Sequence, residues 1–133
     1  MPTITALYAG ILGLISIGLG FLAGRLRGQT NISVGDGGNR DLLLATRRHA
    51  NFAEYVPLAL ILIGLLEMNQ VRHMAIHALG AILVLARLSH AFGIKADTMK
   101  SPGRIIGAAL TMLVTLVASI WAIVIAIDAL QMV

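Results

Sequence analysis

Two long runs without a charged residue constrain the fold of this chain more than any other feature. Residues 2–24 and 105–127 contain no Asp, Glu, Lys or Arg, and each run is 23 residues long. A helix rises about 1.5 Å per residue, so either run can cross the ~30 Å hydrocarbon core of a bilayer. Both runs are therefore predicted to be transmembrane helices.

The composition of the whole chain fits a membrane protein. Of the 133 residues, 58% are hydrophobic and 12% are charged, whereas soluble domains carry about 25% charged residues. This hydrophobicity excludes a disordered chain. The lack of cysteine excludes a disulfide-stapled module, a zinc–thiolate site and a catalytic cysteine. The first apolar run is not interpreted as a signal peptide, because no basic segment precedes it and no small-x-small cleavage site is present.

Two further apolar stretches, residues 55–66 and 74–86, are each too short to cross a bilayer alone. They become long enough only if their helices extend through neighbouring polar turns. Only helices and closed barrels satisfy their backbone in lipid, and the period-2 alternation of a barrel is absent. The predicted fold class is therefore all-α, an integral membrane four-helix bundle forming one domain over residues 1–133. The four helices are expected at about residues 3–27, 40–68, 71–95 and 102–130.

Basic residues gather in and beside the first and third connections. The middle connection carries only Glu67 and Arg72, whereas the other two regions carry Arg25, Arg27, Arg40, Arg47, Arg48, Arg87, Lys95, Lys100 and Arg104. By the positive-inside rule the first and third loops are cytoplasmic and both termini lie on the other side. This placement accounts for the net charge of +4 without nucleic acid as a partner.

Polar residues inside the second predicted helix indicate a binding pocket. Ionisable side chains in membrane helices cost about 2.5–3.5 kcal/mol each on insertion scales, so they tend to face a protein interior and serve a function. Arg47, Asn51 and Glu54 follow at i, i+4 and i+7 and share one helix face. Pro57 leaves a nearby backbone carbonyl without its usual donor. We predict that this face forms a polar pocket wall.

The third and fourth predicted helices each contribute cationic residues. Arg87 and His90 share a face at i, i+3, and Arg87 has two compatible interpretations, an ion pair with Glu54 and a contact with a ligand. The segment from Ser101 to Arg104 has the sequence of a helix start. A cation there opposes the helix dipole by about 0.3–1 kcal/mol. Arg104 is interpreted either as an anchor at the membrane surface or as part of an anion site with free N–H groups.

The spaced histidines His73 and His77 do not predict a metal site. Their i, i+4 spacing suits a metal, but Glu67 is the one further ligand nearby. We expect an ordinary position at the membrane interface.

The glycines are expected to serve in helix–helix contacts and in a turn. The pairs Gly20/Gly24 and Gly103/Gly107 have the small-x-x-x-small spacing that lets helices approach closely. The glycine-rich first loop lacks the spacing of a phosphate-binding loop. It is expected to form a turn, with Asn39 capping the second helix.

Together these residues resemble the family of membrane-associated proteins in eicosanoid and glutathione metabolism, which includes microsomal glutathione transferases and microsomal prostaglandin E synthase. The similarity covers nearly the whole chain. Its most specific part is Arg47-x-x-x-Asn51-x-x-Glu54-Tyr55-x-Pro57, supported by Arg87-x-x-His90 and Pro102-x-Arg104. Residues 35–38, Gly-Asp-Gly-Gly, are similar to the bacterial branch.

The resemblance implies a homotrimer in a bacterial inner membrane that binds glutathione as a co-substrate between subunits, and the positive-inside rule then makes both termini periplasmic. It implies that Arg104 is the catalytic residue and stabilises the glutathione thiolate. The residues that it implies for glutathione binding are Arg25 (from a neighbouring subunit), Arg47, Asn51, Glu54, Arg87 and His90. The other partners would be membrane lipids and a lipophilic electrophile or hydroperoxide that arrives from the bilayer.

The sequence also departs from the family at three positions. Ala50 stands where the prostaglandin synthase has an arginine, Ile94 replaces a tyrosine and Ile105 replaces a serine, so the specialised eicosanoid reactions are not predicted. Three functions stay open. These are a broad glutathione transferase or peroxidase, a non-catalytic trimer that binds lipid or a small ligand, and a small four-helix exporter. The exporter is disfavoured because the first helix lacks the carboxylate that such exporters use.

Overall fold

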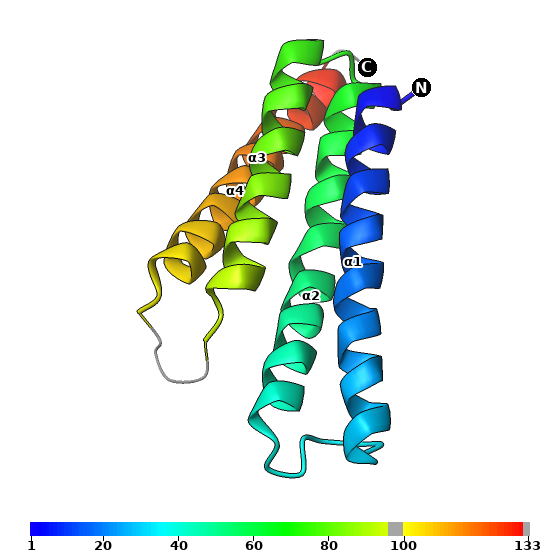
Figure 1. The fold of residues 1–133 in the computed structure, drawn as a ribbon. Coiled ribbons are helices and arrows are strands. Elements are labelled where there is room, and N and C mark those ends of the chain that lie inside the picture. Colours follow the sequence, from blue (N-terminus) through cyan, green and yellow to red (C-terminus); the bar gives the residue numbers. More distant parts are fainter. Residues whose placement is uncertain (96–99, 132–133) are drawn as a thin grey trace.

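The computed structural model describes residues 1–95 and 100–131, which form four helices without a strand (Figure 1). These are α1 (Thr3–Thr30), α2 (Arg40–Met68), α3 (His73–Gly93) and α4 (Pro102–Gln131). Each is long and apolar enough to cross a membrane. The predicted all-α architecture with four membrane-spanning helices is therefore confirmed.

Local sequence signals explain where the helices begin and end. Asn39 is extended, and its side-chain oxygen accepts a hydrogen bond from the Leu42 N–H at 3.0 Å, which is the predicted N-cap of α2. α4 begins at Pro102, the position expected for a first-turn proline. α1 continues past residue 27 and ends where Asn31 adopts a left-handed conformation with φ 55°. α3 begins later than expected because Gln70, with φ 62°, takes part in the turn before it.

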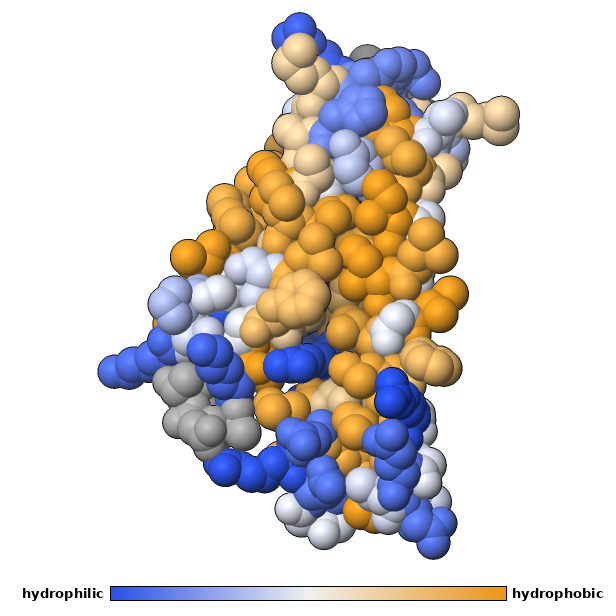
Figure 2. Space-filling model, viewed as in Figure 1, coloured by the Kyte–Doolittle hydropathy of each residue, from blue (hydrophilic) through white to orange (hydrophobic). Residues whose placement is uncertain are grey.

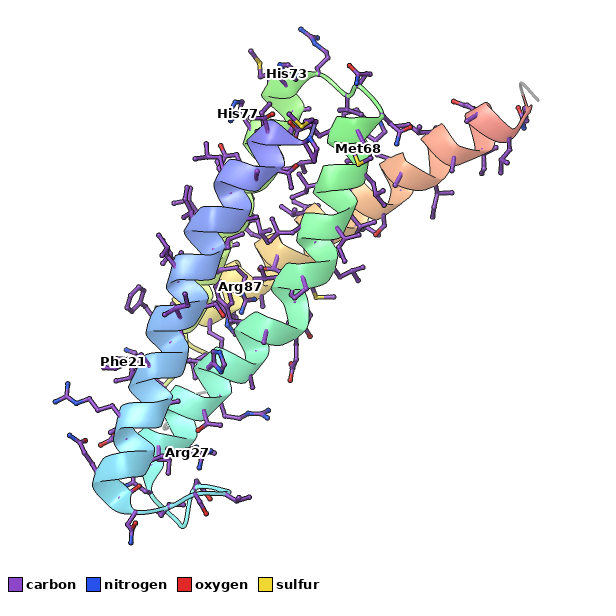
Figure 3. All side chains as sticks on the ribbon, turned by 90° about the vertical axis from the view of Figure 1, so that its right-hand side faces the viewer. Phe21, Arg27, Met68, His73, His77 and Arg87 are labelled. Atoms are coloured by element: carbon purple, nitrogen blue, oxygen red, sulfur yellow. The ribbon has the colours of Figure 1, made fainter. Side chains whose placement is uncertain are left out.

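The helices pack around α2 and α3. α1 packs on both of them, α4 packs on their other side, and within the described residues α1 and α4 do not touch. The start of α1 and the end of α4 lie at the end of the bundle where α2 connects to α3, and the end of α1 and the start of α4 lie at the opposite end (Figure 1). Seen from the side, the C-terminal half of α4 leans away from the other helices (Figure 3).

The apolar side chains divide between a core and an outer belt. Leu12, Phe52, Ile63, Ile76 and Leu83 are buried together between the helices. Large side chains of α1 and α4 face outward, including that of Phe21 (Figure 3). On the face shown in Figure 2, an apolar band crosses the middle of the molecule, with hydrophilic ends above and below it. This pattern is that of a protein whose outer surface contacts lipid.

The predicted glycine contact on α4 is confirmed and holds α4 against α3. A Cβ at Gly107 would lie 2.5 Å from both the Ala86 carbonyl oxygen and the His90 backbone nitrogen. The Ser89 hydroxyl donates to the Gly103 carbonyl at 2.9 Å. Because Arg104 lies between these glycines, this contact places it beside the end of α3.

Of the glycine pair on α1, only Gly20 lies close to another helix. Gly20 faces the ring of His49, and a Cβ at Gly20 would lie 3.2 Å from His49 Nε2, whereas a Cβ at Gly24 would meet open space. The prediction of a close contact at Gly24 is wrong within this chain, because that face of α1 points away from its neighbours.

Glu67 fastens the start of α1 to the end of α2. Its carboxylate is buried and accepts hydrogen bonds from the backbone N–H groups of Ile4 at 2.8 Å and Thr5 at 2.7 Å. The first N–H groups of a helix have no partner within the helix, and a negative charge there complements the helix dipole. The sequence indicates Glu67 only as a possible metal ligand and does not reveal this role.

Glu67→Gln is expected to lower the free energy of unfolding by about 1–3 kcal/mol, because a hydrogen bond to a charged group contributes about that much. Circular dichroism during thermal unfolding in detergent micelles measures the change. Glu54→Gln removes an exposed carboxylate of the same helix and serves as the control, with an unchanged midpoint. A Glu67→Gln midpoint equal to that of the unsubstituted protein would contradict the role of this contact.

Candidate ligand-binding site

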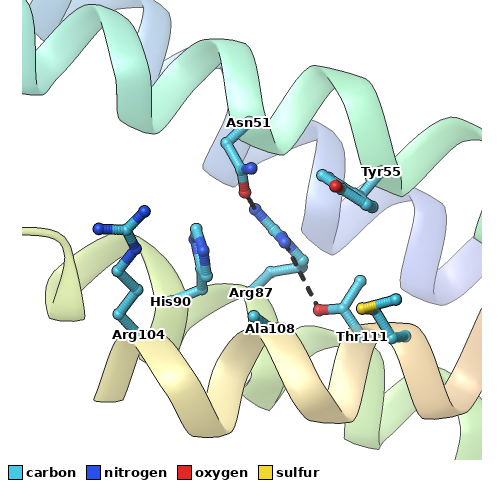
Figure 4. A pocket seen from close by; sticks show the side chains of 8 residues that line it. Asn51, Tyr55, Arg87, His90, Arg104, Ala108 and Thr111 are labelled. Carbon is cyan, nitrogen blue, oxygen red and sulfur yellow. Dashed lines mark hydrogen bonds between the residues drawn. The ribbon is translucent and has the colours of Figure 1, made fainter. Parts of the chain in front are cut away.

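The site is built around Arg87, a fully buried arginine on α3 with 1% of its surface exposed. Its Nη2 donates to the Asn51 side-chain oxygen at 2.7 Å, and its Nη1 donates to the Thr111 hydroxyl at 3.5 Å. The guanidinium also lies over the rings of Phe52 and Tyr55, 5.5 Å and 5.9 Å from their centroids. Arg87 therefore joins α2, α3 and α4 at one point inside the bundle (Figures 3 and 4).

The charge of Arg87 has no carboxylate partner in the part of the chain that the structure describes. The ion pair with Glu54 that the sequence allowed is not formed, because the Asn51 amide occupies that position. The Arg87 Nε is buried and also lacks a hydrogen-bond partner. A buried, uncompensated charge costs several kcal/mol, so this arrangement favours an anion bound beside Arg87.

A cavity of about 220 Å³ adjoins Arg87. In Figure 4, Arg104, His90 and Arg87 follow one another along it, and Asn51 lies opposite on α2. Its full lining is Asn51, Tyr55, Arg87, His90, Arg104, Ala108, Thr111 and Met112. Polar and cationic side chains of α2, α3 and α4 thus line one space between these helices.

Two neighbouring cavities continue this space in opposite directions. Toward the basic loops, a cavity of about 240 Å³ shares walls with the first and adds Leu43, Leu44, Arg47, Ile94 and Lys95. In the other direction, a cavity of about 390 Å³ shares Tyr55 and Met112 and adds Glu54, Leu58, Thr115, Leu116 and Ser119. We call the three the α2–α4 groove. The groove is cationic at the end nearest the basic loops and mainly apolar at the other end. Figure 2 shows hydrophilic atoms in a hollow within the apolar band.

His90 lies where the cationic and central cavities meet. Only 6% of its surface is exposed, and its Nδ1 is buried without a hydrogen-bond partner. A buried polar atom in a native protein is normally satisfied. Within the described chain, the Nδ1 of His90 is thus a buried polar atom left without a partner.

Comparison with known proteins shows the family of this chain. The model of the MAPEG family matches residues 5–124, almost the whole chain. The protein belongs to the MAPEG family. Two relatives carry the name inner membrane protein YecN, one from Escherichia coli strain K12 and one from Escherichia coli O6:H1 strain CFT073. Each is 38% identical over 90 residues, 68% of this chain and 69% of the relative. No solved structure matches.

The structure of this MAPEG protein brings most of the predicted site residues to the groove. Its cationic and central cavities are lined by five of them, Arg47, Asn51, Arg87, His90 and Arg104. Glu54 lines the apolar cavity, on the face of α2 that it shares with Arg47 and Asn51. Arg25 is exposed on α1 and is not among the residues that line the groove. Its role at the site of a neighbouring subunit stays a prediction.

Sequence reasoning missed several residues that line the groove, and two of them add a polar or charged group beside the predicted site residues. Thr111 holds the Arg87 guanidinium, and its signal is its position seven residues after Arg104 on α4, a polar residue on the same face of an apolar helix. Lys95 lines the cationic cavity. Its place in the sequence of this MAPEG chain indicates only that it is one of the basic residues beside the third connection.

The two spaced histidines lie at the far end of the bundle, away from the groove (Figure 3). The Tyr8 hydroxyl and His77 Nδ1 are 3.1 Å apart, and their rings meet edge to face. These contacts join α1 to α3 and give His77 a structural role.

Proposed function

We propose that this protein is a membrane-embedded glutathione transferase or peroxidase, which binds glutathione in the α2–α4 groove and activates its thiolate. The observation that carries the proposal is Arg87, a buried cation without a carboxylate partner among the described residues, in a groove that also contains Arg104 and His90. Membership of the MAPEG family supports it, because the family includes glutathione transferases.

The charges of the groove complement those of glutathione, which carries two carboxylates and one amine. Arg47 and Arg87 supply guanidinium groups for the carboxylates, and Arg104 is kept for the thiolate. Glu54 supplies a carboxylate for the amine. Asn51 is already hydrogen-bonded to Arg87 and has amide N–H groups left to donate to the peptide.

In the proposed reaction the glutathione sulfur lies beside Arg104. A free thiol has a pKa of ~8.5, and the thiolate is the nucleophile. The Arg104 guanidinium and the first turn of α4 both favour the anion, and the thiol proton passes to water at the cationic end of the groove. The sulfur then forms a bond to an electrophilic carbon as the leaving group departs. With a hydroperoxide, two glutathione molecules are oxidised to the disulfide, and the peroxide is reduced to an alcohol and water.

The apolar end of the groove suits the second substrate. Leu58, Met112 and Leu116 line a cavity of about 390 Å³ there, and they are exposed on the surface of the isolated chain. A lipophilic electrophile or hydroperoxide dissolved in the bilayer can reach such a surface without crossing water.

We also propose a homotrimer in the inner membrane with both termini periplasmic. The name of the Escherichia coli relatives supports the membrane. The basic loops and the cationic end of the groove lie at one end of the bundle, which favours that end for the cytoplasm. Arg25, exposed on α1, has a role in the site only if a neighbouring subunit approaches.

The direct test uses the purified protein in detergent micelles. Isothermal titration calorimetry with glutathione measures binding, and turnover is followed with 1-chloro-2,4-dinitrobenzene and with cumene hydroperoxide. We expect binding together with turnover of at least one of the two substrates. Binding without turnover would contradict the enzymatic part and favour a non-catalytic trimer, and absence of binding would contradict the whole proposal.

Glu54→Gln is expected to weaken glutathione binding about two- to fivefold, since a solvent-exposed ion pair contributes about 0.2–1 kcal/mol. Calorimetry measures the affinity. Asp128→Asn removes an exposed carboxylate of α4 that does not line the groove and should leave the affinity unchanged. If Glu54→Gln binds glutathione as tightly as the unsubstituted protein, Glu54 does not hold the amine.

A further inference from the structure

The end of the α2–α4 groove nearest the loops is its most cationic part. The side chains of Arg47, Lys95 and Arg104 line one cavity of about 240 Å³, and no Asp or Glu is among its lining residues. Like charges around one space raise each other's energy, and an anion between them relieves that cost. This cavity is therefore suited to a negatively charged group.

The backbone beside Lys95 is anchored to two helices. Arg48 Nη2 donates to the Ile94 carbonyl at 2.8 Å, which ties α2 to the end of α3. The Ile94 N–H donates to the His90 carbonyl at 3.1 Å, and Ile94 itself is buried. Lys95 follows directly, with an exposed side chain. Its ammonium is thus a point charge on a four-carbon stem at the rim of the cavity.

The opposite side of this cavity is apolar. Leu43 and Leu44 of α2 line it, so the space has cations at its rim and hydrocarbon on one wall. Such a space suits a carboxylate at the end of a short uncharged arm. It also shares Asn51, His90 and Arg104 with the central cavity, so a ligand whose reactive atom lies beside Arg104 can extend one end into it.

We infer that Lys95 is a specificity-determining residue of the groove and holds one of the two carboxylates of the bound thiol tripeptide. The inference rests on the proposed function and adds to it one binding residue and a preference among thiol ligands. Arg87 holds the ligand from inside the bundle, and Lys95 holds its outer end. The protein thereby selects a thiol with two carboxylates over a thiol with one.

The test compares Lys95→Gln with the unsubstituted protein for three ligands. These are glutathione, the monoamide at its glycine carboxylate, and the monoamide at its γ-glutamyl carboxylate. Affinities are measured by calorimetry in micelles at fixed low salt, because salt screens such contacts. We expect Lys95→Gln to bind glutathione about two- to fivefold more weakly, as for other solvent-exposed ion pairs. With the monoamide that lacks the carboxylate held by Lys95, the two proteins should bind equally, since the paired comparison isolates that contact.

Two further variants complete the test. Lys95→Arg should keep the affinity for glutathione within about twofold, because the positive charge is retained. Arg72→Gln removes an exposed cation at the other end of the bundle and should change no affinity. Unaltered glutathione binding by Lys95→Gln, or an equal loss for all three ligands, would overturn the inference while the proposed function stands. If the unsubstituted protein binds no glutathione, the proposed function and this inference both fail.

Discussion

Arg104→Ala is expected to reduce turnover with 1-chloro-2,4-dinitrobenzene about 10²- to 10³-fold, the usual effect of removing one preorganised group that stabilises a reacting anion. In the same variant, the ultraviolet absorbance of the bound thiolate should disappear at neutral pH. Glutathione should still bind, with an affinity lowered far less than the rate, because Arg87 and Asn51 line the same cavity and remain in place.

The substitution should leave the fold intact. The tight contact between α3 and α4 is made by glycines and backbone atoms, including the Arg104 backbone nitrogen beside Gly93, and the substitution keeps that backbone. Arg104→Lys is the matched variant, since an ammonium keeps the charge without the planar fork of a guanidinium. It should retain part of the thiolate signal. A full thiolate signal in Arg104→Ala would show that the activating role belongs to another residue.

The helices of this protein could be predicted from the sequence because a membrane span depends on the hydrophobicity of consecutive residues. Apolar runs of sufficient length leave no alternative to helices in lipid, and Asn39 and Pro102 mark two of the starts. The end of α1 was less predictable. Arg25 and Arg27 suggested that the helix leaves the membrane there, but a charged residue does not stop a helix, and α1 continues to Thr30.

The contacts between helices could not be predicted in the same way. Periodicity shows that Arg47, Asn51 and Glu54 share a face of α2, but not how α3 is rotated about its axis toward that face. Arg87 therefore had Glu54 as a plausible partner, whereas the packed helices give it Asn51. Glu67 contacts Ile4 and Thr5, which precede it by 63 and 62 residues. This contact also depends on how the helices are packed, which periodicity does not give.

Arg87→Met is expected to weaken glutathione binding about 10²-fold or more while the bundle stays folded. Methionine keeps most of the length and packing of the side chain without its charge, so the bundle should still fold, with a loss of stability from the Asn51 group that it leaves unpaired. Loss of a buried, hydrogen-bonded charge that faces a ligand anion, in contrast, costs about 2–5 kcal/mol of binding free energy. Calorimetry with glutathione and thermal unfolding in micelles measure the two effects separately.

The pairing of Arg87 with Asn51 provides the control. In Arg87→Met the Asn51 side-chain oxygen loses its partner at 2.7 Å, which costs about 1–3 kcal/mol of folding stability. Adding Asn51→Leu removes that unpaired group and should restore the unfolding midpoint without restoring binding. A restored midpoint in the double variant would show that the stability loss comes from the unpaired amide. Binding is judged from Arg87→Met alone, because Asn51 also lines the groove. If Arg87→Met is folded and binds glutathione as the unsubstituted protein does, the buried guanidinium is not the contact for the anion, and the function proposed from it is wrong.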